Sequence, residues 1–99
     1  MSLTITKTVN TDECVLTLAG RLDTTTSPQL EAEIRAAEDC DKLLLDMEKL
    51  EYLSSAGLRV LLAAQKMMNK KGGMKVTRVC EEIMEVFDIT GFSDILTIE

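Results

Sequence analysis

The sequence predicts one small α/β domain spanning residues 1–99, with a mixed, mostly parallel sheet of about five strands and three main helices in the order ββαβαβαβ. Two observations lead to this fold class. Two alternating segments near the N-terminus are joined by a short polar turn, which is typical of an antiparallel hairpin. From Leu43 onward, short apolar segments alternate with segments of helical periodicity. Such alternation requires crossover connections, and strands joined by crossovers are parallel.

The hairpin strands are expected at residues 3–9 and 14–19, where apolar and polar residues alternate on either side of the turn "NTDE". Gly20 is expected to end the second strand, and "RLDTTTSP" follows as a loop. Ser27 is a suitable N-cap, and Pro28 suits the first helical position, where its missing N–H costs no hydrogen bond. Apolar residues at i, i+4 and i+7 then predict a helix that lies on a core: Leu30, Ile34 and Ala37.

The second half of the chain is expected to hold three more strands and two more helices. "KLLLDM" is an apolar run bounded by charge, which indicates a central strand covered on both faces. "MKVTRV" predicts the next strand, and "ILTI" predicts a closing strand. "EEIMEVFDI" predicts a helix that Gly91 ends. After "SSAG", an apolar stripe predicts a helix that Gly72-Gly73 ends: Leu58, Leu61, Leu62 and Met68.

Composition narrows the function. The net charge is −6, whereas binding to nucleic acids or to anionic membranes needs clustered Lys and Arg. No apolar run is long enough to span a bilayer and no signal peptide precedes the first strand, so we expect a cytoplasmic protein with neither nucleic acid nor membrane as partner. The three cysteines, Cys14, Cys40 and Cys80, are odd in number and far apart. They are expected to be small buried apolar residues in a reducing compartment.

The chain contains no histidine. Ser-His-Asp and Cys-His catalysis are thereby excluded, as is histidine-ligated zinc, and three dispersed thiols make a poor substitute metal site. Lysine-assisted serine chemistry stays open, although no lysine lies near Ser54 or Ser55 in the sequence. We therefore expect a protein that is not an enzyme and that carries no metal and no cofactor.

The bend "SSAG" at residues 54–57 places two hydroxyls and little side-chain bulk between a strand and a helix. A nucleophile elbow would need a glycine where Leu53 stands, and a phosphate-binding loop would need a lysine and more glycines. A serine that caps the helix explains one hydroxyl but not Gly57, which costs roughly 1 kcal/mol in a first helical turn. A phosphorylation switch explains more, because a kinase can reach an exposed hydroxyl at a helix N-terminus and the helix dipole tolerates a phosphate there.

Three segments of the chain, in the same order, resemble the STAS domains of bacterial anti-sigma factor antagonists. "LLLDMEKLEYLSSAGLRVLLAAQKMMNKKGGMKV" resembles their phosphorylation segment, and "LAGRLDTTTSPQLEAEI" resembles their Gly-x-Leu-Asp loop and first helix. "VFDITGFSDILTI" resembles their closing segment. The resemblance covers nearly the whole chain and implies a single STAS domain over residues 1–99.

In that family, the phosphorylated serine directly follows an Asp and stands two residues before a Gly-Leu pair. The resemblance therefore implies phosphorylation of Ser55. Two residues depart from the family pattern, since Ser54 replaces the Asp and Ala56 replaces a second hydroxyl residue. Asp23 matches the aspartate of the family's first loop, so one carboxylate is still expected near the site.

The resemblance implies a partner-switching regulator. Unphosphorylated, it would bind an anti-sigma factor that is also a serine kinase and so free a sigma factor; phosphorylated on Ser55, it would let go, and a phosphoserine phosphatase would reset it. Gly57 is expected to offer bare backbone to the partner, so that Gly57→Ala would stabilise the fold and weaken binding. The expected partner-binding residues are Asp23, Thr24, Thr25, Ser54, Ser55, Ala56, Gly57, Leu58 and Arg59.

Two other functions stay open at this stage. One is a STAS adaptor subunit that does not switch, for example in lipid transport. The other is a module that senses a small ligand or a nucleotide.

Overall fold

The N-terminal hairpin forms as the sequence predicts. The computed structural model describes residues 2–99 and begins with strand β1, Leu3–Asn10, and strand β2, Glu13–Leu22. The strands pair antiparallel, and Asn10 lies opposite Glu13, so that only residues 11 and 12 form the turn. Alternate side chains of β2 are buried and form one wall of the core: Cys14, Leu16, Leu18 and Leu22.

The prediction that β2 ends at Gly20 is wrong, because the strand continues to Leu22. Gly20 has a φ of +108°, and a Cβ at this position would collide with the backbone carbonyl oxygen of Ser2. Glycine tolerates this conformation, so the strand bends without ending. The Arg21 N–H then donates to the Ser2 carbonyl oxygen at 3.2 Å. The extension carries β2 directly into Asp23.

Helix α1, Ser27–Ala36, starts one residue earlier than predicted, and its N-cap is Thr26 in place of Ser27. The Ser27 hydroxyl donates to the backbone oxygen of Asp23 at 2.5 Å. The Thr26 hydroxyl donates to the backbone oxygen of Arg21 at 2.8 Å. Both hydroxyls therefore hold the preceding loop in shape and do not cap the helix. The predicted core positions of the helix are confirmed by the burial of Leu30, Ile34 and Ala37.

Strand β3, Lys42–Leu53, is twice as long as the predicted "KLLLDM" strand and pairs in parallel with β2 and with strand β4, Met74–Thr77. The register between β2 and β3 shifts twice, between Thr17 and Ala19 and between Gly20 and Arg21. These irregularities break the simple alternation of apolar residues, which is why the sequence pattern does not reveal the second half of β3. The buried apolar side chains of β3 are Leu43, Leu45, Met47, Leu50 and Leu53.

Two further helices form near the predicted positions, but the prediction that Gly72-Gly73 ends the first of them is wrong, because that helix ends at Met68 with Asn69 as its C-cap. Helix α2, Ser55–Met68, buries Leu58, Leu61 and Met68 of the predicted stripe, whereas Leu62 is only half-buried. Helix α3, Glu81–Thr90, ends at Gly91, which has a φ of +81°. An αL residue at this position is the usual end of a helix, and the prediction for Gly91 is therefore confirmed.

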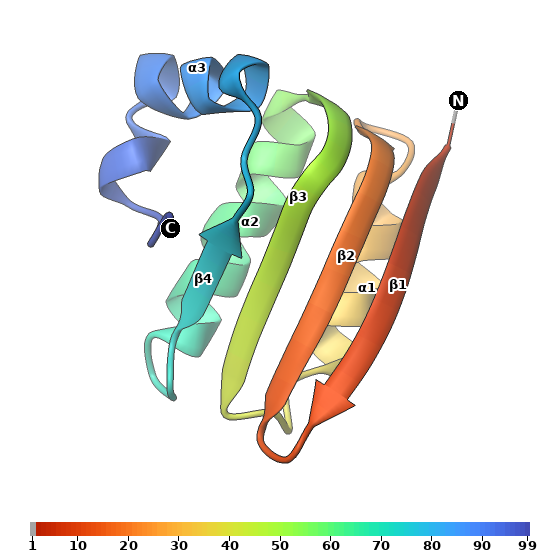
Figure 1. Ribbon diagram of the computed structural model, residues 1–99, viewed down its shortest axis with the longest axis vertical. Coiled ribbons are helices and arrows are strands. Elements are labelled where there is room, and N and C mark those ends of the chain that lie inside the picture. The colour runs from red at the N-terminus through yellow and green to blue at the C-terminus, as the bar shows by residue number, and fades with distance from the viewer. Residues whose placement is uncertain (1) are drawn as a thin grey trace.

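Helices α1 and α2 lie side by side on one face of a four-stranded sheet of order β1-β2-β3-β4, and α3 lies beyond the end of β3 and β4 (Figure 1). The predicted fifth strand is wrong, because Ile98 makes a single parallel bridge with Val76. The preceding residues turn through a short 3₁₀ helix, Phe92–Asp94, so only the last three residues are left to pair with β4. The Val76 N–H donates to the Thr97 oxygen at 2.8 Å, and the Glu99 N–H donates to the Val76 oxygen at 2.9 Å.

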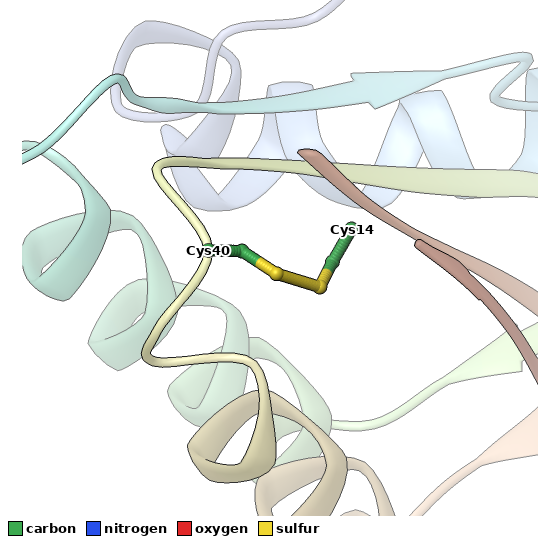
Figure 2. The surroundings of a disulfide bond; sticks show 2 residues. All are labelled: Cys14 and Cys40. Carbon is green, nitrogen blue, oxygen red and sulfur yellow. A yellow bond between two sulfur atoms is a disulfide. The ribbon is translucent and has the colours of Figure 1, made fainter. Parts of the chain in front are cut away.

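The cysteine prediction is wrong for two of the three residues. Cys14 at the start of β2 and Cys40 in the loop after α1 are joined by a disulfide, with their Cα atoms 6.1 Å apart (Figure 2). Cys80 is a free, half-buried thiol that packs against the core, as expected. The two bonded cysteines are 26 residues apart in the sequence, and only the crossover from α1 to β3 brings them together.

An ion pair joins β3 to the end of β4. The Asp46 side chain is only 10% exposed, and its carboxylate accepts hydrogen bonds from the guanidinium of Arg78 and from the Glu48 N–H at 3.1 Å. Arg78 also reaches Glu48, with 3.4 Å between the Arg78 nitrogen and the Glu48 carboxylate. The hydrogen bond from Arg78 holds the pKa of the Asp46 carboxyl below its ordinary value.

We expect Arg78→Met to lower the free energy of unfolding by about 1 kcal/mol at pH 7, because Asp46 loses a charged partner that is itself half-exposed. The pKa of Asp46 in the folded state lies below the unfolded value of about 3.9. The stability that the pair contributes is therefore present above that value and is lost as the pH falls through the folded-state pKa. The difference in the free energy of unfolding between variant and wild type, measured by urea unfolding, should become smaller as the pH falls from about 4 to about 2.

The control for this experiment is Arg35→Met, which removes an exposed ion pair with Glu31 at 3.6 Å. It should change stability by less than about 0.5 kcal/mol at either pH. A difference for Arg78→Met that stayed constant down to pH 2 would assign its effect to packing.

Candidate partner-binding site

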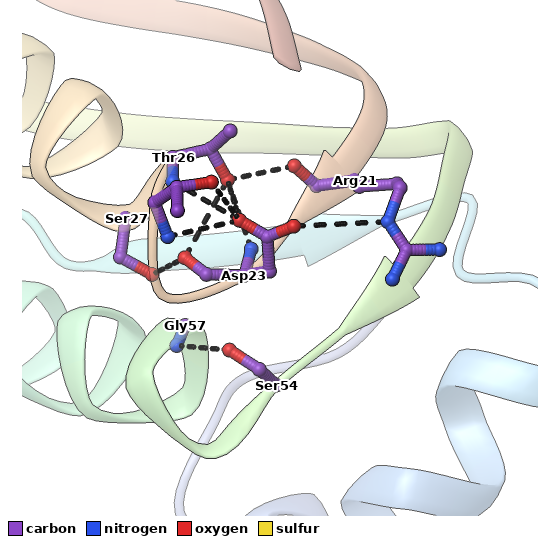
Figure 3. A network of polar contacts seen from close by, with 7 residues as sticks. Arg21, Asp23, Thr26, Ser27, Ser54 and Gly57 are labelled. Atoms are coloured by element: carbon purple, nitrogen blue, oxygen red, sulfur yellow. Dashed lines mark hydrogen bonds and ion pairs between the residues drawn. The ribbon is translucent and has the colours of Figure 1, made fainter. Parts of the chain in front are cut away.

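The two serines in the bend between β3 and α2 have different roles. Ser54 is the N-cap of α2, and its hydroxyl oxygen accepts a hydrogen bond from the Gly57 N–H at 3.3 Å (Figure 3). Its own N–H donates to the Leu22 oxygen at 2.9 Å, which ties the bend to the end of β2. The choice between Ser54 and Ser55 as the cap, which the sequence leaves open, is therefore settled in favour of Ser54.

Ser55 is the first residue of α2 and is exposed. Its hydroxyl makes no hydrogen bond with any group of residues 2–99. The first turn of α2 also contains no acidic residue. Ser55 thus carries an accessible hydroxyl that the fold itself does not use.

The two serines should differ in their effect on stability. Ser54→Ala removes the cap and should lower the free energy of unfolding by about 1 kcal/mol, or roughly 4–8 °C in Tm for a domain of this size. Ser55→Ala should change it by less than about 0.3 kcal/mol, since alanine is a good helix former. Thermal unfolding of the two variants provides a matched comparison. Equal losses for both would show that Ser55 shares the cap.

The next three residues of the bend lie at different depths. Ala56 is half-buried, whereas Gly57 and Leu58 are buried. A Cβ on Gly57 would lie 2.7 Å from Cγ of Leu22 and 2.8 Å from Cδ1 of Leu53. The expectation that Gly57 offers bare backbone to a partner is therefore wrong, and Leu58 likewise faces the core. These two residues support the candidate surface from beneath and are not exposed on it.

Asp23 organises the loop between β2 and α1. One of its carboxylate oxygens accepts hydrogen bonds from the Thr25 hydroxyl at 2.8 Å, the Thr25 N–H at 3.0 Å and the Thr26 N–H at 3.1 Å (Figure 3). The bond from the Thr25 hydroxyl is the main reason why the pKa of Asp23 lies below its ordinary value. Asp23 therefore stays ionised and is a weak base, suited to fixing the loop.

A shallow hollow of about 300 Å³ lies where this loop and α1 meet the start of α2. Thr24 and Arg59, both exposed, lie on its two sides, and Ala56 lines it beside Ser55. The structure thus brings together the two predicted segments, 23–25 and 54–59, which are about thirty residues apart in the sequence.

Two residues next to the bend were missed by the sequence analysis. Arg21 and Tyr52 are paired across β2 and β3, and the guanidinium carbon of Arg21 lies 4.1 Å from the centre of the Tyr52 ring. Arg21 also pairs with Asp23, with 3.7 Å between Nε and the carboxylate. Tyr52 is 41% exposed. Of the exposed large apolar residues in the described chain, it is the nearest to Ser55 in the sequence. Its pairing with Arg21 depends on the shifted register, which the sequence pattern does not reveal.

Among the described residues around the bend, no acid–base pair lies at the Ser55 hydroxyl. Asp23 is held by the loop and is a weak base, and Ser55 has no hydrogen-bonded base in the described chain. Across residues 2–99, no group of three or more His, Cys, Asp or Glu side chains could hold a metal ion. None of the helices in that range is long and apolar enough to cross a membrane. The geometry suits a surface that another protein recognises and modifies.

This chain is similar to known proteins in both sequence and fold over nearly its whole length. Residues 4–99 match the STAS domain family. The anti-sigma-B factor antagonist of Bacillus subtilis is 31% identical over 100 residues, which cover 99% of this chain and 92% of that protein. A crystal structure of an anti-sigma factor antagonist from Mycobacterium paratuberculosis aligns with a TM-score of 0.88 at 26% identity, over 98% of this chain and 85% of the other.

The phosphorylated form of the Bacillus cell fate determinant SpoIIAA also has this fold. It aligns with a TM-score of 0.74 at 19% identity, over 99% of this chain and 91% of the other. At that identity the likeness concerns the fold alone. SpoIIAA, an anti-sigma factor antagonist, has been solved in its unphosphorylated form as well.

Proposed function

The chain belongs to the STAS domain family, and on that premise we propose that it is an anti-sigma factor antagonist. In its unphosphorylated form it binds an anti-sigma factor that is also a serine kinase, and a sigma factor is thereby freed. Phosphorylation of Ser55 ends the binding, and a phosphoserine phosphatase restores it. The relatives named as antagonists of anti-sigma factors support this function.

The main observation in support of the proposal is that the two serines of the bend have different roles. Because Ser54 caps α2, the hydroxyl of Ser55 is free, exposed and can be modified without breaking the cap. A phosphate at this place adds about −1.5 to −2 charges next to the positive end of the helix dipole, where it is tolerated. The modification thus changes the surface while the fold persists.

Charge accounts for the release. Ser55 is exposed and adjoins Ala56, which lines the hollow together with Thr24 and Arg59, so a partner bound over the hollow would exclude water from Ser55. A dianion carries more charge than one neighbouring cation balances, and burying the excess charge in such an interface costs several kcal/mol. Every 1.4 kcal/mol corresponds to a tenfold change in affinity, so a few kcal/mol suffices for release. The proposed surface consists of Asp23, Thr24, Thr25, Ser54, Ser55, Ala56 and Arg59, supported by Gly57 and Leu58.

The partner supplies the chemistry of the switch. The kinase transfers the γ-phosphoryl group of ATP to Oγ of Ser55, ADP leaves, and a base of the kinase takes the hydroxyl proton. The phosphatase uses water to release inorganic phosphate and to regenerate the hydroxyl. This chain acts only as acceptor and binding surface, so it is not an enzyme.

We propose that the protein acts in the cytoplasm, together with its proposed partners. Thiols are kept reduced there, so Cys14 and Cys40 would be free cysteines in that compartment. The disulfide then belongs to the oxidised form of the chain.

The test is phosphate transfer from labelled ATP by the purified anti-sigma factor kinase of the same organism. Wild type and Ser54→Ala should incorporate label, and Ser55→Ala should incorporate none. Phosphopeptide mass spectrometry assigns the residue. Label on Ser54 alone, or no transfer to any variant that remains folded, would contradict the proposed switch.

A further inference from the structure

Arg59 lies one helical turn after Ser55 on α2. Residues at i and i+4 of a helix lie on the same face, with about 5–6 Å between their Cβ atoms. Both side chains are exposed. A phosphate on Ser55 would therefore lie within reach of the long side chain of Arg59.

Arg59 differs from the other arginines of residues 2–99 in having no carboxylate partner. Arg21 pairs with Asp23, Arg35 with Glu31 and Arg78 with Asp46. Arg59 makes no ion pair with any of the described residues. Its guanidinium is thus available in the unphosphorylated protein.

We propose that Arg59 is the internal counter-ion of phosphorylated Ser55. This inference rests on the proposed function, because it concerns the state that the kinase produces. An acidic group that precedes a basic one by four residues has the favourable orientation on a helix. A guanidinium can also donate two parallel hydrogen bonds to one phosphate, which an ammonium cannot match.

Other charged groups near Ser55 are less suited to this role. Arg21 is held by Asp23 and lies over the ring of Tyr52. Glu31 of α1 lines the same hollow as Arg59 but is already paired with Arg35. The first turn of α2 contributes no acidic residue that would compete for Arg59.

The pair would change the hollow as well as Ser55. Arg59 lines the hollow together with Thr24 and Ala56 in the unphosphorylated protein. When it turns to the phosphate, the hollow loses its guanidinium at the moment the surface gains a dianion. Release would thus have two components, a charge added at Ser55 and a guanidinium withdrawn from the hollow.

The experiment incorporates phosphoserine at position 55 during translation, so that no kinase is needed. The second pKa of the phosphate is then measured by ³¹P NMR titration in wild type and in Arg59→Gln. A favourable i,i+4 pair should make the wild-type value lower by about 0.2 to 0.4 pH unit. Arg59→Lys should recover part of the difference, and about 1 M NaCl should reduce it.

Two matched variants make the result specific. Lys70→Gln removes the same charge from the turn that follows α2, at the opposite end of the helix from Ser55, and should leave the phosphate pKa unchanged. Arg21→Gln should also have little effect, because Arg21 is held by Asp23. Equal phosphate pKa values in wild type and Arg59→Gln would overturn the proposal, as would a larger shift for Arg21→Gln than for Arg59→Gln.

The experiment separates a failure of the counter-ion assignment from a failure of the proposed switch. If no kinase modifies Ser55 but the encoded phosphoserine shows the Arg59-dependent shift, the counter-ion assignment stands and the switch fails. If the kinase modifies Ser55 and the shift is absent, the switch stands and the counter-ion assignment fails.

Discussion

Ser55→Asp should weaken binding of the anti-sigma factor by more than about a hundredfold, or roughly 2.7 kcal/mol. The substitution places a permanent carboxylate at the exposed start of α2, on the surface that we propose the partner covers. Removing this carboxylate from water costs several kcal/mol, and an i,i+4 pair with Arg59 returns only about 0.5 kcal/mol of that cost. The helix itself should tolerate the carboxylate, because Ser54 keeps the cap and the helix dipole favours an acid in the first turn.

Ser55→Asn is the matched control, since it has nearly the same shape as aspartate and no charge. It should lose less than about tenfold in affinity, or 1.4 kcal/mol. Isothermal titration of both variants with the purified anti-sigma factor measures the difference, and thermal unfolding should show melting temperatures at or above wild type. Equal losses for Asp and Asn would assign the effect to size. An unfolded Ser55→Asp would mean that the switch is conformational.

Gly57→Ala should lower the free energy of unfolding by about 2 kcal/mol, which is the usual range for overpacking a core. The new methyl would lie 2.7 Å from Cγ of Leu22, a branch point that cannot move without the whole side chain. Leu22 is fully buried and Leu53 is 6% exposed, so neither side chain has room to turn away. The gain of roughly 1 kcal/mol from replacing a helical glycine by alanine offsets only part of this cost.

A second substitution tests the cause of that loss. Leu53→Val removes the methyl group that lies 2.8 Å from the new Cβ. In the Gly57→Ala background it should therefore cost less than it does alone, and calorimetry of the four proteins of this cycle measures the coupling. If Gly57→Ala melted higher than wild type, helix propensity would outweigh packing and Gly57 would have no structural role at the bend.

The sequence predicts most of the fold because most elements are defined by local patterns. The hairpin, α3 and its terminal Gly91 follow from alternation, periodicity and one glycine. The errors fall where a tertiary contact overrides the pattern. Gly20 continues β2 because the backbone of Ser2 approaches it, and residues 95–98 pair only once because the short 3₁₀ helix comes first.

The sequence predicts which segments form the candidate site, but not the hydrogen bonds and packing contacts of their side chains. Spacing along the chain places Ser55 at the start of a helix and Asp23 in a neighbouring loop. Spacing does not show which serine accepts the hydrogen bond from Gly57, nor that Gly57 packs against Leu22. Arg21 and Tyr52 meet only because the β2–β3 register shifts, which no local pattern records.

In the oxidised chain, the Cys14–Cys40 bond closes residues 14–40 into a covalent ring that contains most of β2, the Asp23 loop and all of α1. Ser55 lies outside that ring. A protease that cuts the exposed bond between Thr24 and Thr25 would open the ring without releasing a fragment. On a denaturing gel, the nicked chain would migrate as one band until a thiol reductant separates its two pieces. A cut beside Ser55 would divide the molecule at once. The two halves of one surface therefore respond differently to cleavage, because they differ in chain topology.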